Sequence, residues 1–125
     1  MNILLAEDSD LLRKEIERAL VEIAGVKRVV LSSSVAETRE AVSREVFDLI
    51  MLDFALGDGT ALDLLNDPPA ELGSDGPPVI ILSIHASKAL CQRCLAAGAS
   101  HCFDKTSDWE SLIEVIEQMA GGSAP

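Results

Sequence analysis

The sequence predicts an α/β protein built on a doubly wound parallel sheet, and two features of the chain predict it. Short runs of consecutive apolar residues alternate with stretches in which apolar residues recur every three or four positions. Consecutive apolar runs are typical of strands buried on both faces, and the longer period is typical of amphipathic helices. Strands that alternate with helices fold through right-handed crossovers into a parallel sheet with helices on both faces.

Five strands are predicted along the chain. They span residues 3–6, 29–31, 49–52, 79–82 and 100–103. The first four are uninterrupted apolar runs, so both of their faces are expected to be buried. The fifth is less apolar and is placed between Gly98 and Lys105.

A helical pattern follows each strand. The first pattern ends at Gly25, and its apolar stripe consists of Leu12, Ile16, Ala19, Leu20 and Ile23. Two capping boxes, Ser34 with Glu37 and Ser107 with Glu110, predict the starts of the second and fifth helices. The fifth helix is expected to dock on the sheet through Trp109, Leu112, Ile113, Ile116 and Met119.

The third and fourth helices are predicted less sharply. Residues 60–65 suffice for barely two turns, and residues 66–78 are predicted to be a loop because Pro and Gly recur in them. A helix over residues 88–97 would bury Leu90, Cys94, Leu95 and Ala97, with Gly98 ending it. We therefore expect one domain over residues 1–121, with residues 122–125 as a flexible tail or the start of a linker.

Composition excludes several classes of function. The chain has 125 residues and a formal charge of -11, which argues against direct nucleic-acid binding and favours basic protein partners. No apolar stretch approaches the roughly 18 to 20 residues of a membrane span, and the N-terminus lacks the basic flank of a signal peptide. We expect a cytoplasmic protein without membrane insertion. The length leaves no room for an output domain, so the chain either acts alone or is a fragment.

The three cysteines, Cys91, Cys94 and Cys102, are too few for a disulfide framework. They are expected to be reduced thiols. Cys91 and Cys94 have the C-x-x-C spacing, but they lie within a helical pattern. A packing role is therefore expected for them, rather than a redox or zinc role.

Ionisable and polar residues gather at the carboxyl ends of the predicted strands. They are Glu7 and Asp8 after the first strand, Asp53 at the third, Ser83 after the fourth and Lys105 beyond the fifth. In doubly wound sheets this edge holds the ligand crevice. Three carboxylates brought together repel one another unless a cation lies among them, and Mg²⁺, or Mn²⁺ in its place, prefers such oxygen ligands.

Phosphoryl transfer would use these groups together. It needs an in-line nucleophile, positive charge and a hydrogen-bond donor, and Asp53, a cation with Lys105, and Ser83 could supply them. Taken singly, each residue has a plainer interpretation. Glu7 and Asp8 could favour a helix start, Asp53 could belong to a turn, and Ser83 and Lys105 could be solvated. Only their joint placement favours a site.

The ordered pattern resembles the receiver domain of two-component response regulators over essentially the whole chain. It comprises Glu7-Asp8, Asp53 followed by Leu56-Gly57-Asp58-Gly59, then Ser83, and Gly98-Ala99 leading to Lys105. The resemblance implies strand order 2-1-3-4-5 with five helices, and Asp53 as the phosphoacceptor. It implies that Mg²⁺ is held by Asp8, Asp53, the Ala55 backbone carbonyl and, through water, Glu7. Lys105 would pair with the phosphate, and Ser83 would move toward it after transfer.

The resemblance also implies a signalling role rather than an enzyme that turns over a substrate. A histidine kinase or phosphotransfer protein would donate the phosphoryl group. The surface of the fourth helix, fifth strand and fifth helix would then change to regulate a protein target. The phosphorylated chain could also form a homodimer. Two alternatives stay open. One is a haloacid-dehalogenase-like phosphotransferase or phosphatase, although Ala55 stands where its second Asp belongs, and the other is a pseudo-receiver that binds a partner and is never phosphorylated.

Three positions depart from the usual receiver pattern, and one of them is Thr106, which follows Lys105 where proline is common. Cys102 stands three residues before Lys105, where an aromatic switch residue is usual, and Phe103 should point to the other face of the strand. Ile84 follows Ser83, where the family usually has a very small residue. We expect its side chain to narrow access to the acyl phosphate and to slow hydrolysis.

Overall fold

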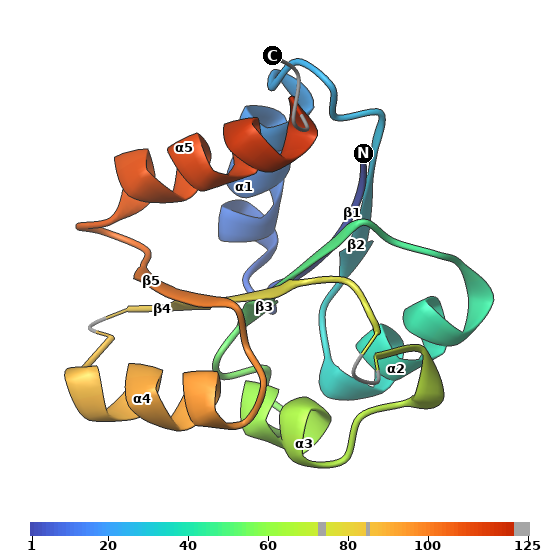
Figure 1. Ribbon diagram of the computed structural model, residues 1–125, viewed down its shortest axis with the longest axis vertical. Helices are drawn as coiled ribbons and strands as arrows, with labels where there is room; N and C mark the ends of the chain where they lie inside the picture. The colour runs from blue at the N-terminus through green and yellow to red at the C-terminus, as the bar shows by residue number, and fades with distance from the viewer. Residues whose placement is uncertain (73–74, 85, 122–125) are drawn as a thin grey trace.

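The computed structural model describes residues 1–72, 75–84 and 86–121, so the tail predicted for residues 122–125 lies outside the described residues. A five-stranded parallel sheet has the order β2-β1-β3-β4-β5 (Figure 1). The strands are β1 (Asn2–Ala6), β2 (Arg28–Ser32), β3 (Leu49–Asp53), β4 (Val79–Ser83) and β5 (His101–Asp104). The predicted fold class and strand order are confirmed.

Five α-helices cover the two faces of the sheet. They are α1 (Asp10–Val21), α2 (Val35–Arg44), α3 (Ala61–Asn66), α4 (Lys88–Ala96) and α5 (Trp109–Ala120). Helices α1 and α5 lie on one face, and α2, α3 and α4 lie on the other (Figure 1). A short 3-10 helix, η1 (Ala70–Leu72), interrupts the connection predicted to be a loop. No helix in the described part of the chain combines the length and apolarity that crossing a membrane requires.

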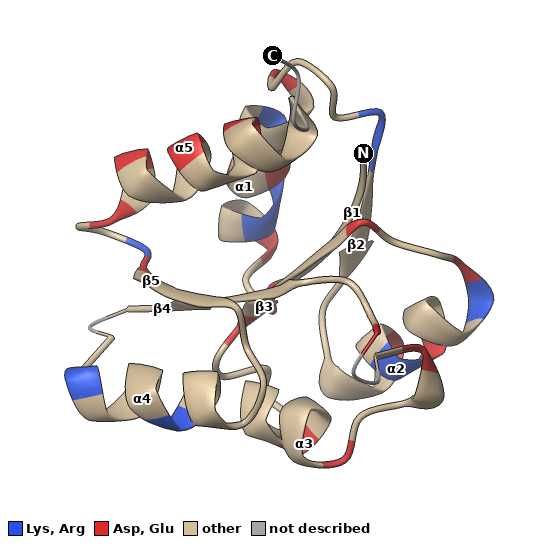
Figure 2. Ribbon diagram, in the orientation of Figure 1, with Lys and Arg blue, Asp and Glu red and all other residues tan. Residues whose placement is uncertain are grey.

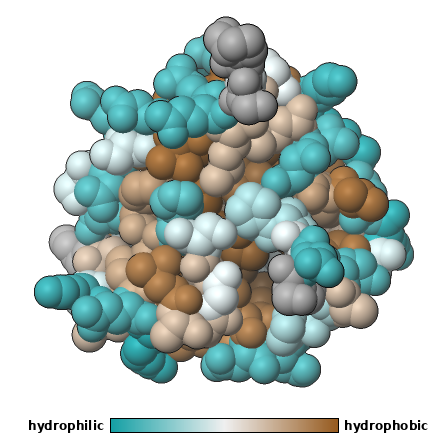
Figure 3. Space-filling model, viewed as in Figure 1, coloured by the Kyte–Doolittle hydropathy of each residue, from teal (hydrophilic) through white to brown (hydrophobic). Residues whose placement is uncertain are grey.

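Two hydrophobic layers hold the helices to the sheet. One contains Leu4, Ile50, Leu52 and Ile81 of the strands, and the other contains Ile3, Leu5, Met51 and Ile80. On the molecular face of Figure 3, hydrophilic residues dominate the periphery and hydrophobic residues occur toward the middle. Alternate side chains of each central strand therefore pack into opposite hydrophobic layers, as the continuous apolar runs predicted.

The prediction that β2 is buried on both faces is wrong. Its residues Val29, Val30 and Leu31 are only half-buried. These residues are only half-buried because β2 is an edge strand and lacks a neighbouring strand on one side. The edge strand β5 is half-buried in the same way.

The helix starts are only partly as predicted. Ser34 caps α2, and its Oγ accepts the Glu37 N–H at 3.0 Å. The Glu37 carboxylate, however, accepts from the Ser33 N–H at 3.3 Å instead of completing a capping box with Ser34. The predicted Ser107 cap is wrong, since α5 begins after Asp108.

One predicted core residue of α4 is also wrong. Leu95 is 46% exposed, whereas Cys94 is fully buried and Leu90 packs against the core. Successive helix residues point about 100° apart, so a helix that buries residues 90 and 94 turns residue 95 outward.

The expectation of three reduced thiols is wrong. Cys91 of α4 and Cys102 of β5 form a disulfide with Cα atoms 5.5 Å apart, and Cys94 is the free cysteine. After α4 the chain turns at Gly98, and β5 then runs back along α4, which brings Cys91 and Cys102 into contact. This pairing depends on helix-to-sheet packing and is invisible in the C-x-x-C spacing.

Candidate functional site

The sheet register places two of the predicted acids side by side. Ala6 of β1 pairs with Leu52 of β3, so Glu7 and Asp53 each follow one member of this pair. Asp8 follows directly, and carboxylate oxygens of Glu7, Asp8 and Asp53 lie within 4.8 Å of one another. Glu7 and Asp53 are 1% and 8% exposed, whereas Asp8 is exposed, so the acidic cluster at the carboxyl edge of the sheet opens to solvent at Asp8.

Helix capping does not account for this cluster. Ser9 is the N-cap of α1, and its Oγ accepts the Leu12 N–H at 3.3 Å. Glu7 does accept the Ser9 N–H at 3.2 Å, so one of its oxygens steadies the cap. Its other oxygen and the carboxylates of Asp8 and Asp53 remain for the site.

Lys105 supplies the positive charge. Its Nζ lies 3.2 Å from Asp53 Oδ1 and forms a closer ion pair with Glu7 Oε1. The Lys105 backbone N–H donates to the Ser83 carbonyl at 2.9 Å, which fixes the lysine beside the end of β4. The structure thus brings together all four charged residues that the sequence selected.

Burial and neighbouring charges shift the acids in opposite directions. Burial and then the Glu7 carboxylate raise the pKa of Asp53 to about 7, even though Lys105 opposes the rise. Burial also disfavours the charged form of Glu7, but hydrogen bonds from Lys105 and the Ser9 amide outweigh it and lower the pKa of Glu7. Glu7 is therefore the ionised partner of Lys105, and the raised pKa of Asp53 favours its protonated form when no cation is bound.

The charge balance fits a divalent cation. With all groups ionised, three carboxylates face one ammonium group, and a doubly charged cation would neutralise the remainder. The ligand atoms are hard oxygens, which suits Mg²⁺ or Mn²⁺. The loop after β3 adjoins this cluster, because a Cβ on Gly57 would lie 3.9 Å from an Asp8 oxygen. Ala55 belongs to this loop and bridges to Thr60, which shapes it.

Asp58 has a different role within the same loop. Its carboxylate accepts the Val35 N–H at 2.8 Å and the Ala36 N–H at 3.1 Å. These bonds lower the pKa of Asp58 and tie the loop to the first turn of α2. In the sequence, Asp58 stands out only as part of the Leu56-Gly57-Asp58-Gly59 motif, and no local signal points to α2.

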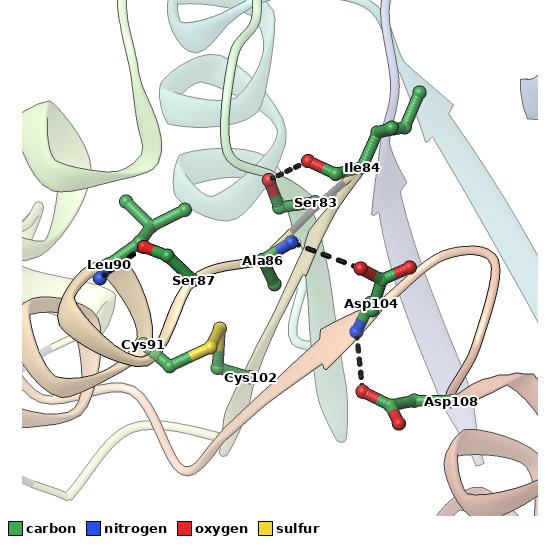
Figure 4. Close-up of a disulfide and its surroundings, with 9 residues drawn as sticks. All are labelled: Ser83, Ile84, Ala86, Ser87, Leu90, Cys91, Cys102, Asp104 and Asp108. Atoms are coloured by element: carbon green, nitrogen blue, oxygen red, sulfur yellow. Dashed lines mark hydrogen bonds between the residues drawn. A yellow bond between two sulfur atoms is a disulfide. The ribbon is translucent and has the colours of Figure 1, made fainter.

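Ser83 and Ile84 lie at the rim of the site. The Ser83 hydroxyl donates to its neighbour, the Ile84 carbonyl, at 3.2 Å (Figure 4). Ile84 itself is 52% exposed. In this structure the hydroxyl is therefore engaged within its own loop.

Cys102 and Phe103 lie on opposite faces of β5, as the alternation predicted. Cys102 packs toward α4, whereas Phe103 packs on the layer under α1 and α5. The Phe103 ring stacks on His101, with centroids 5.6 Å apart. No aromatic ring of β5 therefore lies beside α4.

Asp104 is a residue that sequence analysis missed. Its carboxylate accepts the Ala86 N–H at 3.1 Å (Figure 4). It also accepts the Thr106 hydroxyl at 2.6 Å and the Ser107 N–H at 3.2 Å. The Thr106 hydroxyl is the main cause of the lowered pKa of Asp104. Asp104 thus holds the loop after Ser83 to the loop that carries Lys105.

A parallel sheet in this order, with an acidic cluster and a lysine at its carboxyl edge, defines a receiver-type domain. The chain belongs to the response regulator receiver domain family, whose family model matches residues 3–117. Domains of this family are signalling phosphoacceptors in two-component systems. Membership favours the receiver interpretation over the haloacid-dehalogenase alternative.

Relatives and solved structures agree with this assignment. Response regulator UvrY of Escherichia coli K12 is 22% identical over 98% of the chain, which spans 55% of that relative. A phosphorylated response regulator from Burkholderia pseudomallei, solved with calcium and citrate, aligns with TM-score 0.78 and 24% identity over 96% of this chain and 68% of that one. The magnesium-bound receiver domain of sensor histidine kinase PA1611 from Pseudomonas aeruginosa PAO1 aligns with TM-score 0.78 and 23% identity, covering 97% and 98%.

Proposed function

We propose that residues 1–121 form a phosphoacceptor switch in which Asp53 accepts a phosphoryl group from a phosphohistidine. The observation that carries the proposal is the contact of Lys105 with both Glu7 and Asp53 beside Asp8. Two buried acids, Glu7 and Asp53, that share one lysine are costly to maintain for stability alone. It becomes useful when a dianionic group arrives, because the positive charge is already in position.

The transfer step is a displacement at phosphorus. An Asp53 oxygen attacks the phosphorus atom, the bond from phosphorus to the donor imidazole breaks, and the electron pair stays on the imidazole nitrogen. Lys105 neutralises charge on the transferred group. Asp8, Asp53, the Ala55 carbonyl and, through water, Glu7 would hold Mg²⁺, or Mn²⁺, which supplies further charge neutralisation when bound.

The response would begin at Ser83. Its hydroxyl now donates to Ile84, and an acyl phosphate on Asp53 offers it a stronger, charged acceptor. Movement of Ser83 would pull the loop that leads into α4 and change the surface of α4, β5 and α5. On that surface the exposed charges segregate, with Lys88 and Arg93 on α4 and Glu110, Glu114 and Glu117 on α5 (Figure 2).

The proposed donor is a histidine kinase or a histidine phosphotransfer protein, and the output target is a protein. The acidic surface supports basic docking patches on such partners and disfavours nucleic acid. The solved receiver from Burkholderia pseudomallei carries a phosphorylated aspartate, and the PA1611 receiver holds magnesium in its active-site cleft. By analogy we assign this chain to the cytoplasm, where phosphohistidine donors act, with a phosphorylation-dependent homodimer as one output form.

Intact mass tests the proposal. The parent chain and Asp53→Asn are incubated with acetyl phosphate and Mg²⁺, with and without a chelator. We expect one added phosphoryl group on the parent only, and none in chelator. A parent chain that gains no mass under any condition would favour the pseudo-receiver alternative instead.

A further inference from the structure

The Cys91–Cys102 disulfide connects the helix and the strand that flank the proposed response path. Cys91 lies in the first turn of α4, and Cys102 lies in β5 (Figure 4). The Cα separation of 5.5 Å lies at the commonest spacing for disulfides, so the packing of α4 on β5 itself presents the pair for bonding.

A second contact ties the same segment to the same strand. Residues 84–86 connect Ser83 to Ser87, the N-cap of α4. Within this connection the Ala86 N–H donates to Asp104 at the end of β5. The start of α4 is thus attached to β5 at Ala86 by a hydrogen bond and at Cys91 by a covalent bond. A hydrogen bond can exchange for another during a movement, whereas the covalent bond cannot.

The disulfide is open to thiol chemistry. Cys91 and Cys102 are both partly exposed residues, and we expect an external thiolate to reach their disulfide. Cys94, three residues from Cys91, is fully buried, and burial raises the pKa of its thiol. Cys94 is therefore a poor internal nucleophile, and exchange must come from outside the chain.

We propose that Cys91 and Cys102 form a redox-sensitive modification site that reacts with dithiol reductants and sets how far α4 can respond to phosphorylation. The inference rests on the proposed function of Asp53. As a disulfide, the pair holds the first turn of α4 to β5 and restricts the response. As two thiols, it leaves α4 held by core packing and by the hydrogen bond from Ala86 to Asp104, which can break and reform.

The thiol–disulfide exchange needs no reactant other than the dithiol. One thiolate of the dithiol attacks a sulfur of the pair, the bond between Cys91 and Cys102 breaks, and a mixed disulfide forms. The second thiol of the reductant then displaces the other cysteine. Two electrons and two protons pass to the chain, which gains two thiols while the reductant becomes a disulfide. In a cytoplasmic protein, such disulfides are usually transient or redox-sensing.

Hydrogen exchange tests the inference on the full chain. Exchange over residues 86–97 is compared with and without beryllofluoride and Mg²⁺, once in the disulfide form and once after reduction by a dithiol. We expect the beryllofluoride-induced change in α4 to be about tenfold larger in the reduced form, because local opening no longer has to preserve the covalent link. The double variant Cys91→Ser/Cys102→Ser should respond like the reduced parent in both conditions, and Cys94→Ala should respond like the parent.

The outcomes separate the two proposals. An equal beryllofluoride response in the disulfide and reduced forms overturns the redox inference and leaves the proposed function standing. Titration of three thiols after equilibration in an oxidising thiol buffer overturns it as well. No beryllofluoride response in either form overturns the proposed function, and the redox inference fails with it.

Discussion

The Nζ atom of Lys105 lies 3.2 Å from Oδ1 of Asp53, although β4 separates the strands from which the two residues come. The same ammonium group also pairs with Glu7. Lys105 therefore reaches across the end of β4 to compensate two acids at once. Its removal would leave both acids buried with no lysine between them.

Lys105→Ala should slow phosphorylation of Asp53. Removing a positioned donor of this kind lowers rates by about 100-fold, because the developing charge on the transferred group loses its partner. The rate is followed by intact mass during incubation with acetyl phosphate at saturating Mg²⁺. Lys27→Ala is the control, since Lys27 is exposed next to β2, away from the site. Equal rates in the two variants would remove Lys105 from the transfer step.

The raised pKa of Asp53 should make the metal-free protein less stable as pH rises. The folded value is about 7, against an ordinary value of 3.8. Between these values the folded chain keeps a proton that the unfolded chain has lost. The free energy of unfolding therefore falls with rising pH, by up to about 1.4 kcal/mol for each pKa unit of difference.

Asp53→Asn isolates this effect. Urea denaturation of both proteins in chelator, between about pH 5 and about pH 8, should show the variant gaining stability over the parent as pH rises. Adding Mg²⁺ should reduce the difference, because a bound cation favours the ionised aspartate. Parallel stability curves in chelator would show that Asp53 titrates with its ordinary pKa.

Reduction of the Cys91–Cys102 disulfide should lower the free energy of unfolding by about 3 kcal/mol, since the link closes a loop of roughly a dozen residues in the unfolded chain. Urea denaturation with and without reductant measures the loss. Cys91→Ser/Cys102→Ser should not respond to reductant, whereas Cys94→Ala should keep the full response. A parent chain unaffected by reductant would show that the pair is not oxidised in solution.

Gly25→Ala should destabilise the fold at the end remote from the site. Gly25 has φ +94, and an added Cβ would lie 2.7 Å from the Ala120 carbonyl oxygen. Gly98→Ala is a matched control, because Gly98 has φ +118 but no atom within 4 Å of its added Cβ. Both variants carry backbone strain of about 1–3 kcal/mol, and Gly25→Ala adds a clash. Equal losses in thermal denaturation would mean that α5 shifts freely away from Gly25.

Ile84→Ala should shorten the lifetime of the acyl phosphate. Ile84 is bulky, half-exposed and adjacent to Ser83, so its removal opens the route by which water reaches Asp53. The loss of phosphoryl mass is timed after the donor is removed. Leu95→Ala, which truncates an exposed apolar residue on the outer side of α4, should leave the lifetime unchanged. An unchanged lifetime in Ile84→Ala would remove the access argument.

Much of the fold was predictable because its central strands are uniformly apolar. The runs at β1, β3 and β4 predicted the observed strands to within a residue. The half-exposure of β2 was not predictable from its own residues, since Val29, Val30 and Leu31 are as apolar as a central strand. Whether a strand is central or at an edge depends on the order of strands in space.

Part of the candidate site was predictable in the same way, and part was not. Glu7, Asp8, Asp53 and Lys105 could be selected because each follows a strand, and parallel strands deliver their ends to one edge. Contacts between loops and helices could not be predicted from the sequence. The Asp104 bond to Ala86 and the Cys91–Cys102 disulfide depend on how α4 packs against β5, for which spacing in the sequence carries no signal.

The most direct test of the account identifies the residue that carries the phosphoryl group. After incubation with acetyl phosphate and Mg²⁺, borohydride reduces an aspartyl phosphate to homoserine, and peptide mass mapping locates the converted residue. Conversion of Asp53 alone is expected, with no conversion when a chelator is present. Conversion of Asp8 in place of Asp53, or phosphoryl mass retained by Asp53→Asn, would contradict it.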